Sequence, residues 1–113
     1  NIFVADSFNN RVQKFDQNGI FLMKFGTSGT GDGQFNNPFE LAIDSSDNIF
    51  VVDNNNNRVQ IFNNNGEYIS QFGNQGSAAE RLQDPITITI DTSDNVYIGD
   101  GIDTDIHVYS PVK

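Results

Sequence analysis

Aspartate and arginine side chains at a repeated spacing are the residues of this sequence best suited to chemistry. Asp6 precedes Arg11 by five residues, and Asp53 precedes Arg58 by the same five. A carboxylate beside a guanidinium can bind a charged ligand, or it can form a bidentate ion pair that ties two segments of the chain together. Because the pair recurs at one spacing, the sequence favours the second interpretation and predicts structural bridges.

A third copy of this spacing departs from the pattern and is the best candidate for a metal site. Asp105 stands where the arginine is expected, and Asp100 and Asp103 lie close to it in the sequence. Carboxylate oxygens are the ligands that Ca²⁺ prefers, but the spacing does not match the EF-hand loop, which requires a defined glycine and a later glutamate. The alternative is a solvated acidic loop, so the sequence supports Ca²⁺ only weakly.

The residues needed for a catalytic centre do not come together in this sequence. It contains one histidine, His107, and no cysteine, so neither a thiolate nor a cluster of histidines is available for metal or nucleophilic catalysis. The glycine-rich stretch Gly26–Gly33 lacks the Gly-Lys-Ser/Thr ending of a phosphate-binding loop. We therefore predict that the chain is not an enzyme and binds no cofactor.

Composition limits the classes of partner. Lys and Arg number 6 against 15 acidic residues, which gives a formal net charge of -9, and the basic residues form no stripe. Because phosphate contacts dominate nucleic-acid affinity, this charge disfavours RNA and DNA as partners. No apolar run is long enough for a membrane span. An acidic, cysteine-free, asparagine-rich chain fits an extracellular or cell-surface location, although it is also compatible with cytoplasm.

An internal repeat of 47 residues organises these side chains. The segment Asn1–Asp6 returns as Asn48–Asp53 and again as Asn95–Asp100, and Asn10–Phe15 returns as Asn57–Phe62. The 113 residues therefore hold about 2.4 repeats. A fixed period in this range is typical of architectures in which each unit buries its faces against its neighbours.

Each repeat predicts four short antiparallel strands. The first repeat has its β-branched and aromatic residues in the segments Ile2–Ala5, Arg11–Phe15, Ile20–Phe25 and Leu41–Ile43. Such segments are typical of strands, and Asn-Gly between two of them is a strong hairpin signal. Four strands in 40–50 residues are the pattern of a β-propeller blade, so we expect an all-β fold of propeller blades.

The repeat resembles the NHL repeat of β-propellers. The shared motifs are, in order, Gly33–Pro38, Leu41–Asp44, Asn48–Asp53 and Asn57–Phe62. The resemblance covers essentially the whole chain, and the tryptophans typical of WD and kelch repeats are absent. NHL propellers usually close with about six blades. The resemblance therefore implies a segment of one ring, completed by further residues, by protein partners or by copies of the same chain.

The resemblance also divides this single propeller domain, residues 1–113, into blades whose strands are lettered a to d from the axis outward. The repeat copies are 1–47, 48–94 and the partial copy 95–113. The expected blades are 1–25 with strands b to d, 38–72 with strands a to d, and 85–109 with strands a to c. This amounts to about two and a half blades.

Five positions are candidates for contact with a partner. Phe8, Asn55 and Ile102 are equivalent in the three repeats, differ in type, and lie at the expected tips of the b–c loops. An exposed phenylalanine at such a tip is a typical contact residue, or else it packs on the adjacent blade. Glu40 and Thr87 follow the strand-a proline, where NHL repeats commonly have glycine, near the mouth of the central channel. They either face a ligand or are polar side chains in a wet channel.

These observations favour a non-catalytic scaffold for protein or glycan interaction and assembly. Two alternatives stay open. The chain is part of a propeller lyase or hydrolase whose catalytic residues lie in other blades, or it is a structural unit of a larger extracellular assembly or filament. A fold does not by itself determine a function. The choice among these three functions therefore depends on the residues that the blades expose.

Overall fold

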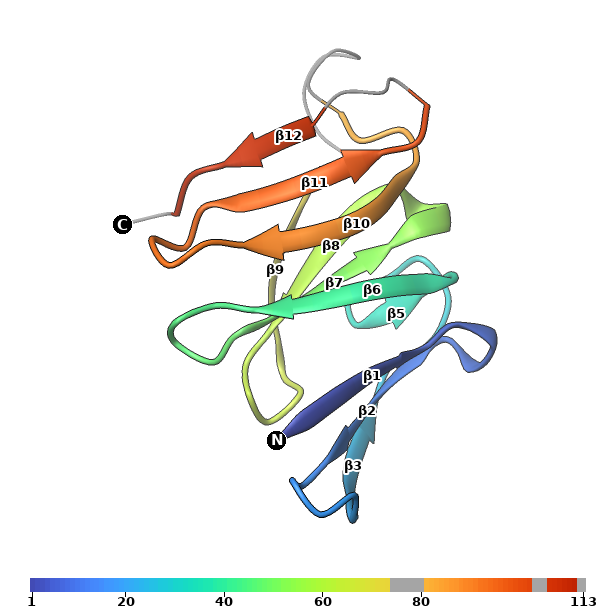
Figure 1. Cartoon of the computed structure of the whole chain (residues 1–113). Helices are drawn as coiled ribbons and strands as arrows, with labels where there is room; N and C mark the ends of the chain where they lie inside the picture. Colours follow the sequence, from blue (N-terminus) through green and yellow to red (C-terminus); the bar gives the residue numbers. More distant parts are fainter. Residues whose placement is uncertain (74–80, 103–105, 112–113) are drawn as a thin grey trace.

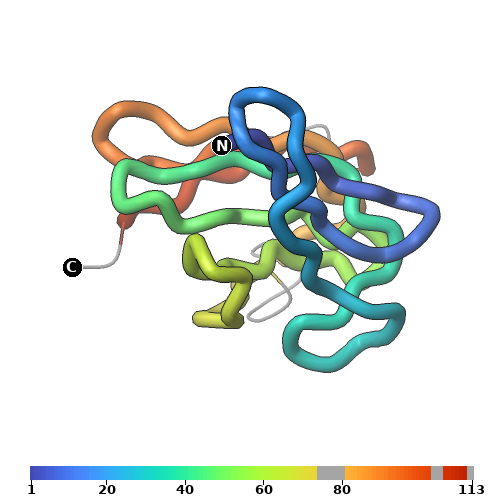
Figure 2. Tube along the Cα trace, turned by 90° about the horizontal axis from the view of Figure 1, so that it is seen from below, coloured from blue at the N-terminus to red at the C-terminus, as the bar shows by residue number. Residues whose placement is uncertain are grey.

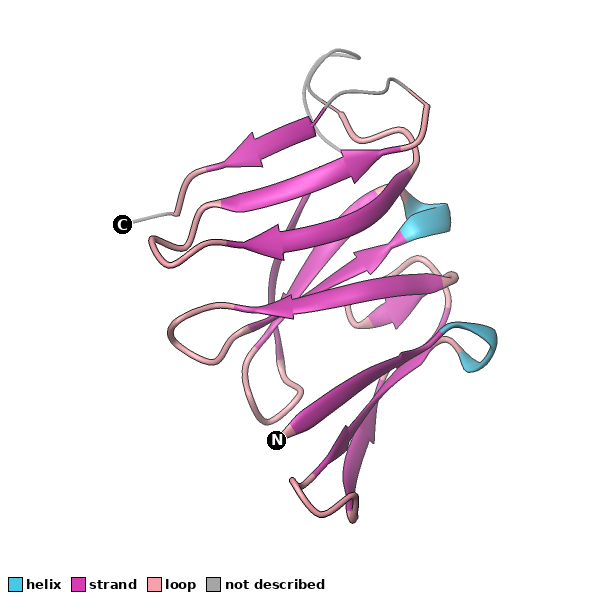
Figure 3. Cartoon of the chain, viewed as in Figure 1, coloured by secondary structure: helices cyan, strands magenta, loops and turns pink. Residues whose placement is uncertain are grey.

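The computed structural model describes residues 1–73, 81–102 and 106–111. Over these residues the strands form three larger antiparallel sheets, stacked one on another and here called blades 1, 2 and 3 (Figures 1 and 3). Blade 1 contains β1 (Ile2–Asp6), β2 (Arg11–Phe15) and β3 (Phe21–Phe25). Blade 2 contains β6 (Pro38–Ile43), β7 (Ile49–Asp53), β8 (Arg58–Phe62) and β9 (Tyr68–Phe72). Blade 3 contains β10 (Pro85–Ile90), β11 (Val96–Asp100) and β12 (Ile106–Tyr109).

Short turns join the strands within each blade, and their sequences explain their shape. Asp44 closes the turn between β6 and β7, because its carboxylate accepts hydrogen bonds from the amides of Ser46 and Asn48, both at 2.9 Å. In the equivalent turn of blade 3, Asp94 holds a left-handed conformation with φ of 65°, which aspartate tolerates better than most residues. Its carboxylate also accepts a hydrogen bond from the amide of Ser45 at 2.9 Å, so the turns of neighbouring blades are linked.

The connections from β1 to β2 and from β7 to β8 place aspartate beside arginine. A single 3-10 turn reverses the chain in each case, η1 (Ser7–Asn9) in blade 1 and η2 (Asn54–Asn56) in blade 2, and a left-handed asparagine follows. Asp53 therefore lies directly opposite Arg58 in the register of β7 and β8. The corresponding pair of blade 1 has the same register.

The core of the described structure lies between the blades. The cluster between blades 1 and 2 buries Val12, Phe35, Ile49, Val51 and Phe62. The cluster between blades 2 and 3 buries Phe50, Val52, Val59, Leu82, Ile88, Val96 and Ile98. Successive side chains of a strand point to opposite faces, so β7 buries alternate residues against blade 1 and against blade 3. Figure 2 looks along this stack from the side of blade 1.

Residues 26–37, here called the linking loop, connect β3 of blade 1 to β6 of blade 2. The loop contains β4 (Thr27–Ser28) and β5 (Gln34–Phe35), which form a parallel pair of two residues each. The sequence predicted a plain connection here, because two-residue strands are too short to show an alternating pattern. The pair folds the loop back on itself and brings its backbone against blade 2.

Candidate functional site

Asp53, Arg58 and Gln60 form a buried polar cluster in blade 2, here called the blade 2 clamp. The Arg58 Nε donates to the Asp53 Oδ2 at 2.8 Å, and the Gln60 Nε2 donates to the same oxygen at 3.2 Å. The side chains of Arg58 and Asp53 are only 4% and 0% exposed. Breaking a buried ion pair by removing one partner is strongly destabilising, so this cluster constrains blade 2.

The guanidinium of Arg58 fastens the linking loop to blade 2. Its Nη2 donates to the carbonyl oxygens of Gly31 at 3.0 Å and Gln34 at 2.8 Å. Its Nη1 donates to the Oε1 of Gln71 at 2.8 Å. The planar donor fork of arginine suits several acceptors at fixed angles. All three of its nitrogens therefore bind acceptors of the chain itself.

Gln60 and Asp53 complete this attachment. The Gln60 side chain donates to the carbonyl of Gln34 at 2.6 Å and accepts from the amide of Gly33 at 2.8 Å. The Asp53 Oδ1 accepts from the amide of Asn36 at 2.8 Å. The sequence did not single out Gln60 as a site residue. Its identity with the residue 47 positions earlier was the signal that pointed to it.

The first repeat contains the same cluster, formed by Asp6, Arg11 and Gln13 and here called the blade 1 clamp. Arg11 donates to Asp6 at 3.0 Å, and Gln13 and Asn9 each donate to the same oxygen at 3.1 Å. The hydrogen bond from Asn9, followed by that from Arg11, lowers the pKa of the Asp6 carboxyl. The side chains of Arg11 and Asp6 are 31% and 22% exposed, so this clamp is open to solvent.

In the third repeat Asp100 takes the place of the clamp aspartate. Its carboxylate accepts hydrogen bonds from the amides of Gln83 at 2.7 Å and Asp84 at 3.2 Å, and the His107 Nε2 lies 3.8 Å away. Asp103 and Asp105, the other members of the calcium candidate, lie outside the described residues. In the part of the chain that the structure describes, no three acidic or histidine side chains are arranged to hold a metal ion.

The loop-tip face is the surface formed by Phe8, Asn55 and Ile102. All three follow the b strand of their blade, at the end where the 3-10 turns lie in Figure 3. Phe8 is 99% exposed and Ile102 is 61% exposed. Asn55 is exposed although its amide donates to the carbonyl of Asn36 at 3.1 Å. This position therefore stays accessible even where a linking loop packs beside it.

Glu40 and Thr87 occupy the inner strands of blades 2 and 3, and both are exposed. The Glu40 Oε1 accepts a hydrogen bond from the amide of Ile88 at 2.9 Å. The Thr87 hydroxyl lies against Gly99, close to where a β-carbon would stand. Glu40 thus links β6 to β10 through one carboxylate oxygen. This hydrogen bond uses part of the hydrogen-bonding capacity of its carboxylate.

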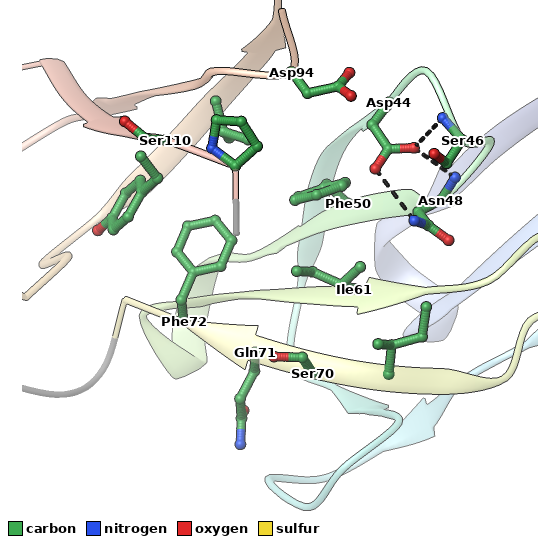
Figure 4. Close-up of a pocket in the computed structure, with 14 residues that line it drawn as sticks. Asp44, Ser46, Asn48, Phe50, Ile61, Ser70, Gln71, Phe72, Asp94 and Ser110 are labelled. Carbon is green, nitrogen blue, oxygen red and sulfur yellow. Dashed lines mark hydrogen bonds between the residues drawn. The ribbon is translucent and has the colours of Figure 1, made fainter. Parts of the chain in front are cut away.

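A cleft of about 650 Å³ opens between blades 2 and 3. Figure 4 shows Phe50 and Phe72 inside it and Asp44 and Asp94 where the turns approach one another. Tyr109 packs against Phe72 with ring centroids 4.3 Å apart. Burial raises the pKa of the Tyr109 hydroxyl, which has no hydrogen-bond partner among the described atoms. Aromatic walls and a polar rim are typical of a small-molecule site.

The corresponding space between blades 1 and 2 is filled, and this argues against a ligand in the cleft. The turn between β8 and β9 occupies it, with Gly66 against Met23 and Phe25. The residue 47 positions after Gly66 is Lys113, which lies outside the described residues. We assign no ligand to the cleft.

A comparison with known protein families identifies one whose members share this fold. The family model DUF5128, described as a 6-bladed beta-propeller, matches residues 44–111. No curated protein matches the chain. None of the described residues belongs to a helix long and apolar enough to cross a membrane.

Proposed function

The chain belongs to this six-bladed β-propeller family, and we propose that it is a non-catalytic scaffold of the NHL type that binds another protein through its loop-tip face. The NHL assignment is supported by the motifs of the repeat, among them Gly33–Pro38 and Asn48–Asp53. A propeller presents loops from successive blades on one rigid face, which suits recognition of a folded partner.

The exposure of Phe8 is the observation that carries this proposal. An aromatic side chain that is 99% exposed at a loop tip gains more than most residues when a partner covers it, because aromatic residues dominate interface energetics. Ile102 adds a second apolar contact at the equivalent position. The net charge of -9 favours a partner with a basic or neutral surface, since complementary charge speeds association.

The hydrogen bonding of the clamps supports a scaffold without a reaction of its own. A catalytic carboxylate needs an oxygen available to substrate or water. In blade 2 both carboxylate oxygens of Asp53 accept hydrogen bonds from the chain, and the guanidinium of Arg58 is fully engaged. The proposal therefore assigns binding to the loop tips and attachment to the clamps.

Site-specific photocrosslinking in the source cells tests the proposal. A benzophenone side chain is placed at Phe8, and in a control at Phe21, which is 51% exposed in β3. We expect one protein to be captured from position 8 and not from position 21. Equal capture from both positions contradicts the loop-tip face. Failure of capture from position 8 in a folded, expressed protein contradicts it too, as does binding only to glycans.

A further inference from the structure

The turn between β8 and β9, residues 63–67, presents an asparagine followed by a glycine to solvent. The carboxamide of Asn65 is exposed, and it makes no hydrogen bond within the part of the chain that the structure describes. Gly66 follows, and a glycine has no side chain to shield its backbone nitrogen. The pair therefore offers both groups that asparagine deamidation requires, a free carboxamide and an unshielded nitrogen on the next residue.

Deamidation at this pair is a reaction of the chain with itself and with water. The Gly66 nitrogen loses its proton and bonds to the Cγ of Asn65. The bond from that carbon to the side-chain nitrogen breaks, and this nitrogen takes up a proton and leaves as ammonia, so that a cyclic imide remains. Water then opens the imide at either carbonyl. The products have aspartate or isoaspartate at position 65, and in isoaspartate the main chain passes through the former side chain.

In the folded chain the reacting nitrogen is held in place. The Gly66 amide donates to the carbonyl oxygen of Asn63 at 3.0 Å, and this hydrogen bond has to break before the nitrogen can lose its proton. The Asn63 side chain closes the same turn, because its Oδ1 accepts from the amides of Asn65 and Glu67, both at 3.0 Å. The reaction therefore proceeds from a locally opened turn, and the free energy of that opening controls its rate.

Contacts with blade 1 and with the turn between β6 and β7 oppose this opening. The Lys14 Nζ donates to the Asn64 Oδ1 at 2.8 Å and to the Asn64 carbonyl oxygen at 3.1 Å. The Asn64 Nδ2 in turn donates to the carbonyl oxygen of Asp47 at 3.1 Å. Lys14 is only 9% exposed, so its charge is weakly screened by solvent. All of these groups belong to blades 1 and 2, so the anchor of the turn lies wholly within the described residues.

We propose that Asn65–Gly66 is a deamidation site whose rate is set by the attachment of this turn to blade 1, and whose isoaspartate product weakens that attachment. Isoaspartate adds the former β-carbon of Asn65 to the main chain. A β-carbon on Gly66 would already lie 2.7 Å from the end of Met23 and 2.9 Å from the Phe25 ring. A longer turn therefore has no room in the present position. This site is separate from the loop-tip face and does not rest on the proposed function.

Incubation of the chain in mildly alkaline buffer, followed by tryptic mapping and mass spectrometry, tests the first half of the proposal. The sequence has one other Asn-Gly pair, Asn18–Gly19, and its tryptic peptide is distinct because Arg58 lies between the two pairs. Deamidation at Asn65 should be slower in the folded chain than in denaturant, since the opened turn is the reactive form. Absence of reaction at Asn65 even in denaturant would show that it is not a modification site.

Variants of the anchor show whether blade 1 sets the rate. Lys14→Met keeps the length of the side chain and removes its donor, and it should speed deamidation at Asn65 about tenfold or more, because hydrogen bonds to charged groups are stronger than neutral ones. Asn64→Ala removes the same contact from the other side and provides the test if Lys14→Met does not fold. Lys24→Met removes one positive charge from an exposed position of blade 1 and should leave the rate unchanged. Equal rates in the folded anchor variants and the unchanged chain would overturn the proposal.

The stability of the isolated product tests the second half. Chromatography separates the isoaspartate form, and Asn65→Asp is its matched control, because it carries the same added charge on a main chain of ordinary length. In urea, the isoaspartate form should have an unfolding equilibrium constant raised about tenfold or more, as is usual where a packed site is overfilled. Asn65→Asp should change this constant by less than about twofold, as is usual for exposed sites. An isoaspartate form as stable as Asn65→Asp would show that the longer turn fits, and the proposal would be wrong.

Discussion

At the scale of single residues, the side chains best suited to chemistry are held by hydrogen bonds and ion pairs to other groups of the same chain. Asp53 shows this most clearly: one oxygen accepts from Arg58, Gln60 and Asn56, and the other accepts from the amide of Asn36. Such a carboxylate is a poor nucleophile or base, because its lone pairs are occupied and its position is fixed.

The three tyrosines should titrate above the ordinary pKa of 10.0. Burial raises the pKa of Tyr68 and Tyr109, and the hydrogen bond to the Asp91 carboxylate raises that of Tyr97. Their contribution to stability is complete below pH 10 and is lost as the pH rises through the folded-state values. The chain contains no tryptophan, so its ultraviolet absorbance reports the phenolates without interference. This absorbance should therefore rise at higher pH in the folded chain than in denaturant. Coincident curves would contradict these environments.

At the scale of elements, the turn between β8 and β9 fastens blade 2 to blade 1. Gly66 has φ of 80°, and a β-carbon there would lie 2.7 Å from the end of Met23 and 2.9 Å from the Phe25 ring. Gly19 occupies the equivalent turn of blade 1 with φ of 81°, and a β-carbon there would meet nothing within 4 Å. The two glycines thus share a conformation and differ only in what they touch.

Alanine at these two glycines should therefore separate conformation from packing. Both substitutions cost about 1–2 kcal/mol of stability, because L-residues disfavour the left-handed region. Gly66→Ala should cost about 1–3 kcal/mol more, as overpacked sites usually do. Urea unfolding of the two variants measures the difference. Equal losses would show that the turn does not press on blade 1.

The strands could be predicted from the sequence, but the attachment of the linking loop could not. Alternating apolar residues and Asn-Gly turns make segments such as Arg58–Phe62 recognisable, because their pattern is local. The clamp depends on Arg58 and Gln60 meeting carbonyl groups more than twenty residues earlier, which no local pattern encodes. Only the recurrence of the glutamine at 47 residues hinted at its role. The exposure of Phe8 likewise follows from tertiary packing and not from its type.

At the scale of the whole molecule, the stacked blades and the family match confirm the expected all-β propeller fold. Each blade buries its faces against its neighbours, as repeat architectures require. In our account two groups of residues have separate roles. The clamps hold blades and loops together, and the loop-tip face is the surface that we propose binds a partner.

Thermal and urea unfolding of Arg58→Ala beside Phe8→Ala tests this division most directly. Arg58→Ala should lower the free energy of unfolding by about 3–5 kcal/mol, because it leaves the Asp53 carboxylate buried without its partner. Phe8→Ala should change it by less than about 0.5 kcal/mol, as is usual for exposed sites. Arg11→Ala, at a more exposed ion pair, should cost only about 1 kcal/mol or less. A chain that keeps its stability without Arg58, or loses it without Phe8, would contradict the account.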